Sequence, residues 1–267
     1  MHQRSYGALR LGFKRREHGT VLADLRQEGC LKARFPRSEP GAWAGAVTLN
    51  TSGGVAGGDR LGIAVRAGAG TRLSIASQAA ERFYRAIPGS YAEVSNHLTV
   101  EPGAALEWLP QETILFDRCA LRRRLRIDLA VEASFLGVES LVFGRAAMGE
   151  TVGTAEIDDL VELRREGKLV LHDRIRLHGP VSALLDRRAV AAGARAAGTL
   201  IHVAPEAESR LDALRVALAP FDAGASFADG LLLARIVARD GAALRSAVVA
   251  GLNVLRDGRK LPRVWLC

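Results

Sequence analysis

Apolar and polar residues alternate through short segments along most of the chain up to residue 177, and breaks rich in glycine and proline separate these segments. Alternation places successive side chains on opposite faces of a strand. Because such segments recur at short, regular spacing, the sequence predicts an all-β fold. No fixed-period repeat is visible. The expected strands cover residues 6–13, 21–25, 31–35, 61–67, 73–77, 91–100, 105–109, 125–131, 135–143, 160–163 and 169–177. Residues 77–85 fit either a loop or one helical turn.

The hydrophobic period changes near the C-terminus. Leucines at 211, 214 and 218 follow helical spacing and stop before Pro220. After an expected strand over 231–237, Asp240 is a candidate helix cap, and a second apolar stripe runs through residues 244–255. We expect two C-terminal helices that close the end of the β core. A docking surface for another protein is the alternative role for them.

Residues 49–61 form the most exacting stretch, with the sequence Leu-Asn-Thr-Ser-Gly-Gly-Val-Ala-Gly-Gly-Asp-Arg-Leu. Its two pairs, Gly53-Gly54 and Gly57-Gly58, predict a structural loop that reaches backbone angles difficult for other residues. A phosphate-binding loop requires a lysine after the last glycine, but Asp59 and Arg60 follow here, so a nucleotide site is excluded. The loop therefore connects two strands and presents Asp59, which either caps the turn or has a function.

Two carboxylates occupy positions where the alternation calls for apolar side chains. Glu139 shares one strand face with Phe135 and Leu141, and Asp173 shares another with Leu171 and Ile175. An unpaired buried carboxylate is costly or becomes neutral, so each needs an arginine, water or a cation. One interpretation is a buried ion pair with an arginine, for which the candidates are Arg145, Arg174 and Arg176. The other is a polar interior channel that holds a divalent ion weakly, since oxygen ligands without thiolates let a metal pass on.

A formal charge of +8 and a pI near 10.1 make nucleic acid a partner to consider. However, the basic clusters at residues 14–16 and 122–124 are short, and aromatic residues make up only 5% of the chain. Base-stacking platforms are therefore not indicated. A basic nucleic-acid-binding β protein is still the alternative function. A glycosidase with a pair of acids is a third hypothesis. Sugar-binding sites usually have aromatic platforms, and the three tryptophans of this chain are few for that purpose.

The sequence carries none of the compact motifs of hydrolases or metal sites. It has no GxSxG nucleophile elbow, no HExxH motif and no CxxC pair. We therefore expect no nucleophilic hydrolase site, no tight metal site and no tightly bound cofactor. No apolar run approaches the length of a membrane span, which makes the cytoplasm the expected location.

The glycine-rich stretch over residues 49–61 resembles the signature loop of the urease accessory protein family UreD, called UreH in some organisms. The similarity continues in the family's order through several further segments and covers nearly the whole chain. These segments are Gln78-Ala79-Ala80-Glu81-Arg82-Phe83-Tyr84-Arg85, Leu106-Glu107-Trp108-Leu109-Pro110-Gln111-Glu112, Phe143-Gly144-Arg145, Met148-Gly149-Glu150 and Leu261-Pro262-Arg263-Val264-Trp265-Leu266. Residues 1–267 are accordingly expected to form a single UreD-like domain. The chain differs from many relatives in having Leu-Asn-Thr-Ser, and no proline, before the glycines.

The resemblance implies a non-catalytic scaffold with a β-helix-like fold that helps deliver nickel to urease. It implies UreF, the GTPase UreG and the urease apoprotein as partners, with GTP bound only by UreG. It also implies an internal tunnel as the route of Ni²⁺. The residues matched to that tunnel are Asp59, Ser77, Gln78, Glu112, Glu139 and Asp173, and transient Ni²⁺ is expected at Asp59, Glu139 and Asp173.

Overall fold

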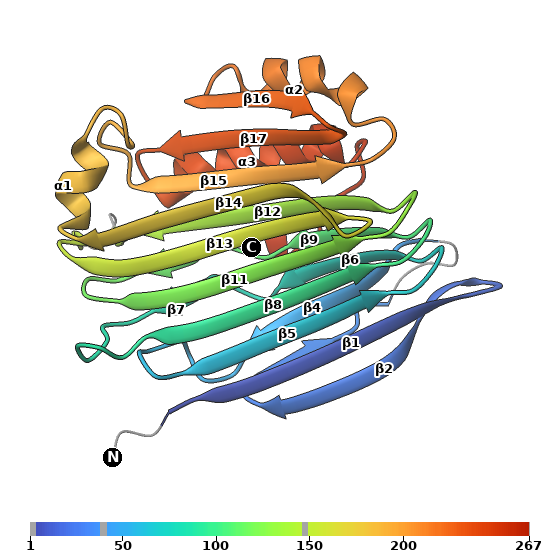
Figure 1. Cartoon of the computed structure of the whole chain (residues 1–267), viewed down its shortest axis with the longest axis horizontal. Helices are drawn as coiled ribbons and strands as arrows, with labels where there is room; N and C mark the ends of the chain where they lie inside the picture. The colour runs from blue at the N-terminus through green and yellow to red at the C-terminus, as the bar shows by residue number, and fades with distance from the viewer. Residues whose placement is uncertain (1–3, 38–41, 146–148, 267) are drawn as a thin grey trace.

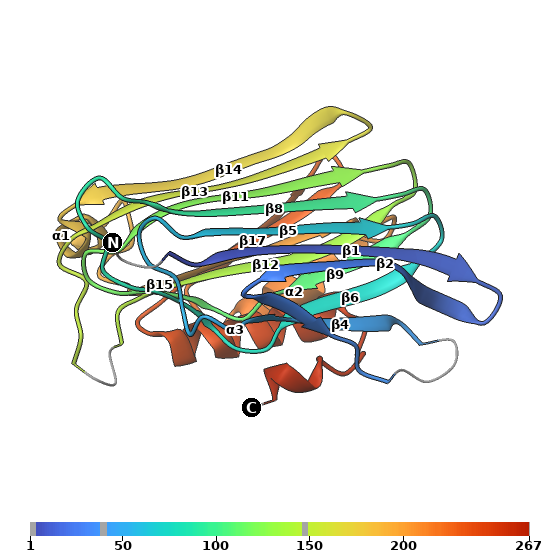
Figure 2. The same ribbon diagram turned by 90° about the horizontal axis from the view of Figure 1, so that it is seen from below.

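The computed structural model describes residues 4–37, 42–145 and 149–266. Met148 of the family-like segments and part of the breaker-rich stretch 36–41 lie outside these ranges. Two sheets face each other across the interior, with helices on the far side of one of them (Figures 1 and 2). The strands of the first sheet, sheet A, are in spatial order β14 (Lys168–Gly179), β13 (Ala155–Arg165), β11 (Ala120–Leu129), β8 (Ala92–Val100), β5 (Arg60–Ala67), β1 (Tyr6–Arg16) and β2 (Gly19–Gly29).

Sheet B faces sheet A and carries the C-terminal strands at one end. Its strands are in spatial order β16 (Ala223–Ala228), β17 (Leu231–Ala238), β15 (Ala196–Val203), β12 (Ser134–Phe143), β9 (Ala105–Leu109), β6 (Arg72–Ser77), β4 (Ala44–Asn50) and β3 (Leu31–Arg34). Two short strands, β7 (Glu81–Phe83) and β10 (Thr113–Leu115), pair in parallel with each other, and β10 also pairs with β12. The segment 77–85 therefore contains a short strand where a loop or helical turn was expected.

The chain alternates between the two sheets and pairs in parallel with its own previous turn, which makes the fold β-helix-like. Arg60 lies beside Glu93, Ala92 beside Leu121, and Ala120 beside Glu156, so successive turns take 33, 29 and 36 residues. The unequal turn lengths explain why no fixed repeat is visible in the sequence. The predicted all-β, β-helix-like fold is confirmed.

Apolar side chains form two clusters, one in each layer of the structure. The first fills the space between the sheets and includes Leu73 and Leu121. The second lies between sheet B and the helices α2 (Leu211–Leu218) and α3 (Gly241–Leu255), and includes Leu214 and Leu244. Figure 2 shows α2 and α3 on the face of sheet B that points away from sheet A.

Both predicted C-terminal helices are confirmed. The Asp240 carboxylate accepts a hydrogen bond from the Ala243 amide at 2.8 Å and so caps α3. Three short helical segments complete the described secondary structure: α1 (Val181–Asp186), η2 (Glu208–Arg210) and η3 (Arg263–Trp265). Strand β15 and helix α1 fall in a region where no element was predicted.

Candidate functional site

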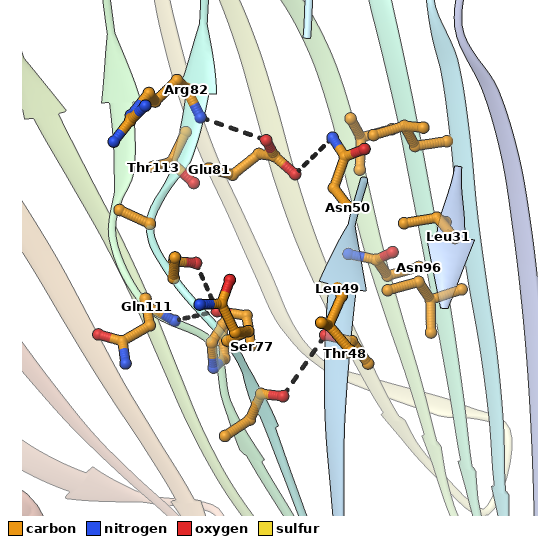
Figure 3. A pocket seen from close by; sticks show the side chains of 18 of the residues that line it. Leu31, Thr48, Leu49, Asn50, Ser77, Glu81, Arg82, Asn96, Gln111 and Thr113 are labelled. Atoms are coloured by element: carbon orange, nitrogen blue, oxygen red, sulfur yellow. Dashed lines mark hydrogen bonds between the residues drawn. The ribbon is translucent and has the colours of Figure 1, made fainter. Parts of the chain in front are cut away.

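A cavity of about 330 Å³ lies between the sheets below the glycine-rich loop. It is lined from both sides, for example by Thr48 of β4 and Asn96 of β8. Gly53, Gln78 and Arg82 line it and are exposed, so the cavity opens to the surface at this end. We call it the first cavity, and Figure 3 shows its polar side chains from close by.

The glycine loop at this opening requires glycine for steric reasons. Gly53, Gly54 and Gly58 have positive φ angles of 79°, 138° and 92°. A Cβ atom on Gly57 would lie 2.3 Å from the Ser90 carbonyl oxygen. Glycine is therefore the residue that fits these four positions with the least strain.

Ser77 and Gln111 connect the loop after β6 to the loop after β9 at the edge of the first cavity. The backbone amide of Gln111 donates to the Ser77 hydroxyl at 2.7 Å, and that hydroxyl donates to the Ala79 carbonyl at 3.0 Å. Both side chains line the cavity, as does Gln78. Ser77 and Gln78, two of the residues expected along a polar path, thus face the same space.

Glu81 adds a carboxylate to this cavity. Asn50 donates its side-chain amide to Glu81 at 3.0 Å, and the two side chains point toward each other in Figure 3. Burial raises the pKa of Glu81, and the hydrogen bond from Asn50 opposes that rise. Nearby, the buried Oδ1 atom of Asn96 has no hydrogen-bond partner among the described residues. Buried polar side-chain atoms usually have a hydrogen-bond partner, so this atom is an exception in the wall of the cavity.

At the inner end of the first cavity, an arginine is held between two acids. Arg123 of β11 donates to both oxygens of Asp159 at 2.8 and 2.6 Å and to the Thr113 hydroxyl at 2.9 Å. The guanidinium also lies 2.9 Å from Glu139 of β12. The Trp108 indole donates to the second oxygen of Glu139 at 3.1 Å. Burial raises the pKa of Glu139, Arg123 opposes the rise, and Asp159 adds to it.

A second cavity of about 110 Å³ lies on the other side of this cluster. Glu139 lines both cavities, and Asp159 and Asp173 line the second. Asp173 of β14 forms a 2.7 Å ion pair with Arg235 of β17. The Arg235 side chain is 48% exposed, so the second cavity reaches the surface at this pair.

Four of the six predicted tunnel residues line these cavities, namely Ser77, Gln78, Glu139 and Asp173. The other two contact different parts of the fold. Both carboxylate oxygens of Asp59 accept backbone hydrogen bonds, from Ser5 at 2.7 Å and from Ala56 at 2.8 Å, which is the turn-capping alternative. Glu112 pairs with Arg245 of α3 at 2.9 Å.

Glu139 and Asp173 both point inward, as the alternation predicted, with side chains 10% and 12% exposed. The arginines suggested for them were wrong. Their partners are Arg123 and Arg235, whereas Arg145 pairs with Glu150, Arg174 pairs with Asp158, and Arg176 contacts His178.

Sequence reasoning missed Arg123, Asp159 and Glu81. Arg123 shares the inward face of β11 with Leu121 and Leu125, so the alternation carried a signal that the run of three arginines concealed. Asp159 likewise shares the inward face of β13 with Val161, just before the stretch predicted as a strand. Glu81 fell in the ambiguous segment 77–85.

The described residues show few signs of the alternative binding sites. They contain no group of three or more histidine, cysteine, aspartate or glutamate side chains arranged to hold a metal ion. The basic cluster at residues 122–124 does not present one face, because Arg123 points inward while Arg122 stacks on Tyr91 and Arg124 pairs with Asp158. No described helix combines the length and apolar character needed to cross a membrane.

Comparison with known proteins gives one consistent family. The sequence model of the family described as UreD urease accessory protein matches residues 5–266. A protein of Xanthobacter autotrophicus named urease accessory protein UreD is 47% identical over 267 residues, which cover 99% of this chain and 91% of that protein. Proteins of the same name from Azorhizobium caulinodans and a Methylobacterium species are 44% and 46% identical, and the matches cover 98% of this chain and 97% and 95% of those proteins. The chain therefore belongs to the UreD family of urease accessory proteins.

Proposed function

We propose that this chain is a non-catalytic scaffold in urease maturation and that Ni²⁺, as cargo, passes through the two cavities between its sheets. The observation that carries the proposal is that the Glu139 carboxylate lines both cavities, which also contain other polar side chains and each have exposed residues in their walls. The route would run from the glycine loop past Ser77, Gln78 and Glu81 to Glu139, and then to Asp173. Asp59 does not line this route. Its role in the proposal is to stabilise the glycine loop, where it accepts a hydrogen bond from the Ala56 amide.

The chemistry of the lining supports transit over storage. The oxygen-bearing side chains along both cavities are carboxylates, hydroxyls and amides, and they lie beside the guanidinium groups of Arg82, Arg123 and Arg235. Neither cavity is lined by a described cysteine or histidine. Thiolate and imidazole ligands bind late first-row divalent metals tightly, whereas isolated oxygen ligands bind them weakly. A path of this composition lets a cation move between sites. It holds no resident cofactor in this proposal.

The partners follow from the same proposal. We infer that the chain acts in the cytoplasm in a complex with UreF, the GTPase UreG and the urease apoprotein, and that GTP binds only to UreG. The membership in a urease accessory family supports this inference. The arginine cluster of β11 does not support the alternative function of nucleic-acid binding.

The test is co-expression with the urease genes, followed by pull-down on this chain and measurement of nickel in the recovered urease. Glu139→Ala is expected to lower that nickel content while the complex still forms, since Arg123 keeps its bidentate contact with Asp159. Asp212→Ala is the matched control, because its side chain is 94% exposed on α2. Normal nickel content in urease recovered with the Glu139→Ala variant would rule out a Ni²⁺ route through this residue. Failure to recover UreF, UreG and urease in the pull-down would rule out the scaffold role.

A further inference from the structure

The two cavities do not run freely into each other, because the side chain of Arg123 stands where they meet. Arg123 lines the first cavity, and its two acidic partners, Glu139 and Asp159, line the second. The arginine side chain is only 9% exposed and makes four close contacts there, two with Asp159 and one each with Glu139 and Thr113. The junction is therefore filled by a cation that belongs to the protein.

A buried guanidinium acts on a passing divalent ion in two ways. It keeps its positive charge under all ordinary conditions, so it repels a second cation at short range. It also uses the carboxylate oxygens of Glu139 and Asp159 that such an ion would need as ligands. A cation that enters the first cavity thus meets an occupied junction at its inner end.

We propose that Arg123 is a gate residue, whose guanidinium blocks passage of a divalent cation from the first cavity to the second until it leaves Glu139 and Asp159. This inference rests on the proposed transit function and adds its regulation. The guanidinium faces the first cavity, whose volume of about 330 Å³ offers space for the side chain when it moves aside. Arg123 is a positioning and gating residue, not a ligand.

Trp108 provides a local probe, since its indole N–H is bonded to Glu139. The full chain labelled with ¹⁵N has three tryptophans, and Trp108→Phe identifies which indole signal belongs to residue 108. Titration with NiCl₂ then reports Ni²⁺ near Glu139 through paramagnetic broadening of that signal. In Arg123→Met, half-broadening is expected at a Ni²⁺ concentration lower than in the wild type by about tenfold or more, because a neighbouring like charge has been removed and two carboxylates freed.

Adding Asp159→Asn to Arg123→Met is expected to reverse most of this gain, because one of the freed carboxylates is neutralised. Equal Ni²⁺ responses of the wild type and a folded Arg123→Met chain would overturn the gate. If Arg123→Met does not fold, Thr113→Val decides the matter, since it removes one contact of the guanidinium and leaves both acids in place. A lowered half-broadening concentration in Thr113→Val supports the gate, and an unchanged one rejects it.

This titration contains no urease, so it separates the gate from the transit function. A gain of Ni²⁺ response in Arg123→Met together with normal urease nickel content in Glu139→Ala leaves a gated cation site that urease maturation does not use. Reduced urease nickel content in Glu139→Ala without any gain in Arg123→Met leaves the route intact and removes the gate.

Discussion

Glu139 and Asp173 line the same cavity from opposite sheets, yet each carboxylate is bound by a different arginine. The two pairs differ in solvent access. Arg123, the partner of Glu139, is 9% exposed, whereas Arg235, the partner of Asp173, is 48% exposed. Water can replace the contacts of Arg235 more easily than those of Arg123. Asp173 is accordingly the acid that a cation can free at lower cost.

The first prediction concerns this more accessible pair. Asp173→Asn is expected to change the free energy of unfolding by less than about 1 kcal/mol, since an ion pair with a half-exposed arginine contributes little to stability. It is also expected to lower nickel in co-expressed urease, because a carboxylate of the second cavity is lost. Urea denaturation and metal analysis of the recovered urease check the two parts. Asp212→Asn, on the surface of α2, serves as the control, and a drop in stability without a drop in nickel contradicts the prediction.

The second prediction concerns the buried cluster. Asp159→Ala is expected to lower the free energy of unfolding by about 3 kcal/mol, the lower end of the range for breaking a buried ion pair, because Glu139 still neutralises Arg123. Urea denaturation measures this change.

Asp186→Ala is the matched control for Asp159→Ala. Asp186 pairs with Arg195 at 2.7 Å, close to the 2.6 Å of the buried pair, but its side chain is 58% exposed. Its removal is expected to cost less than about 1 kcal/mol. Equal losses in the two variants would show that burial does not decide the strength of these pairs.

The sequence predicted the β-rich body and the C-terminal helices because their signals are local. Alternation reports strands with one buried face, such as β5 with Leu61 and Val65 inward. Strand β15 gave no such signal, because residues 198–203 are buried on both faces, between sheet A and α3. Its side chains are buried without regard to polarity, including Thr199 and His202, so apolar and polar residues do not alternate along it.

Parts of the candidate site were predictable for the same reason. Glu139 and Asp173 interrupt apolar strand faces, and this interruption is visible in the amino-acid sequence alone. Their partners could not be predicted, because the β-helix-like winding decides which strands face each other. Arg123 lies on the strand just before that of Glu139 but in the opposite sheet, and Arg235 lies on a strand far along the chain from Asp173. For Asp59 the sequence left two alternatives, a turn cap or a function. Its contacts with the Ala56 amide inside the loop and with the Ser5 amide, 54 residues away, correspond to the first.

The third prediction tests the glycine loop at the opening of the first cavity. Gly57→Ala is expected to lower the free energy of unfolding by about 1–3 kcal/mol, because the new methyl group meets the Ser90 carbonyl and the Ala86 side chain, and crowding a packed site has this cost. Thermal or urea denaturation measures it. Gly224→Ala in β16 is the control, since nothing lies within 4 Å of its added Cβ and its backbone is not left-handed. A loss in Gly224→Ala as large as that in Gly57→Ala would refute the steric explanation.

The fourth prediction concerns pH and Glu81. Burial raises the pKa of Glu81 above its ordinary value of 4.5 in the folded chain. The ionised side chain is thus less favourable in the folded state than in the unfolded state. Its contribution to stability is fully present below pH 4.5 and is lost as pH rises through the folded-state pKa. Glu81→Gln removes this titration, so the variant is expected to gain stability relative to the wild type as pH rises from about 4 toward 7.

Asp128 supplies a control of opposite sign. Burial alone would raise its pKa, but hydrogen bonds from Arg126 and His97 outweigh burial and lower the pKa below 3.8. Its contribution is present above pH 3.8 and is lost as pH falls through the folded-state pKa, so Asp128→Asn loses stability relative to the wild type as pH rises from about 3 toward 5. Urea denaturation of each variant and of the wild type, across the pH range given for that variant, measures how the difference in the free energy of unfolding changes with pH. Slopes of the same sign would mean that the desolvation of Glu81 in the first cavity does not control its ionisation.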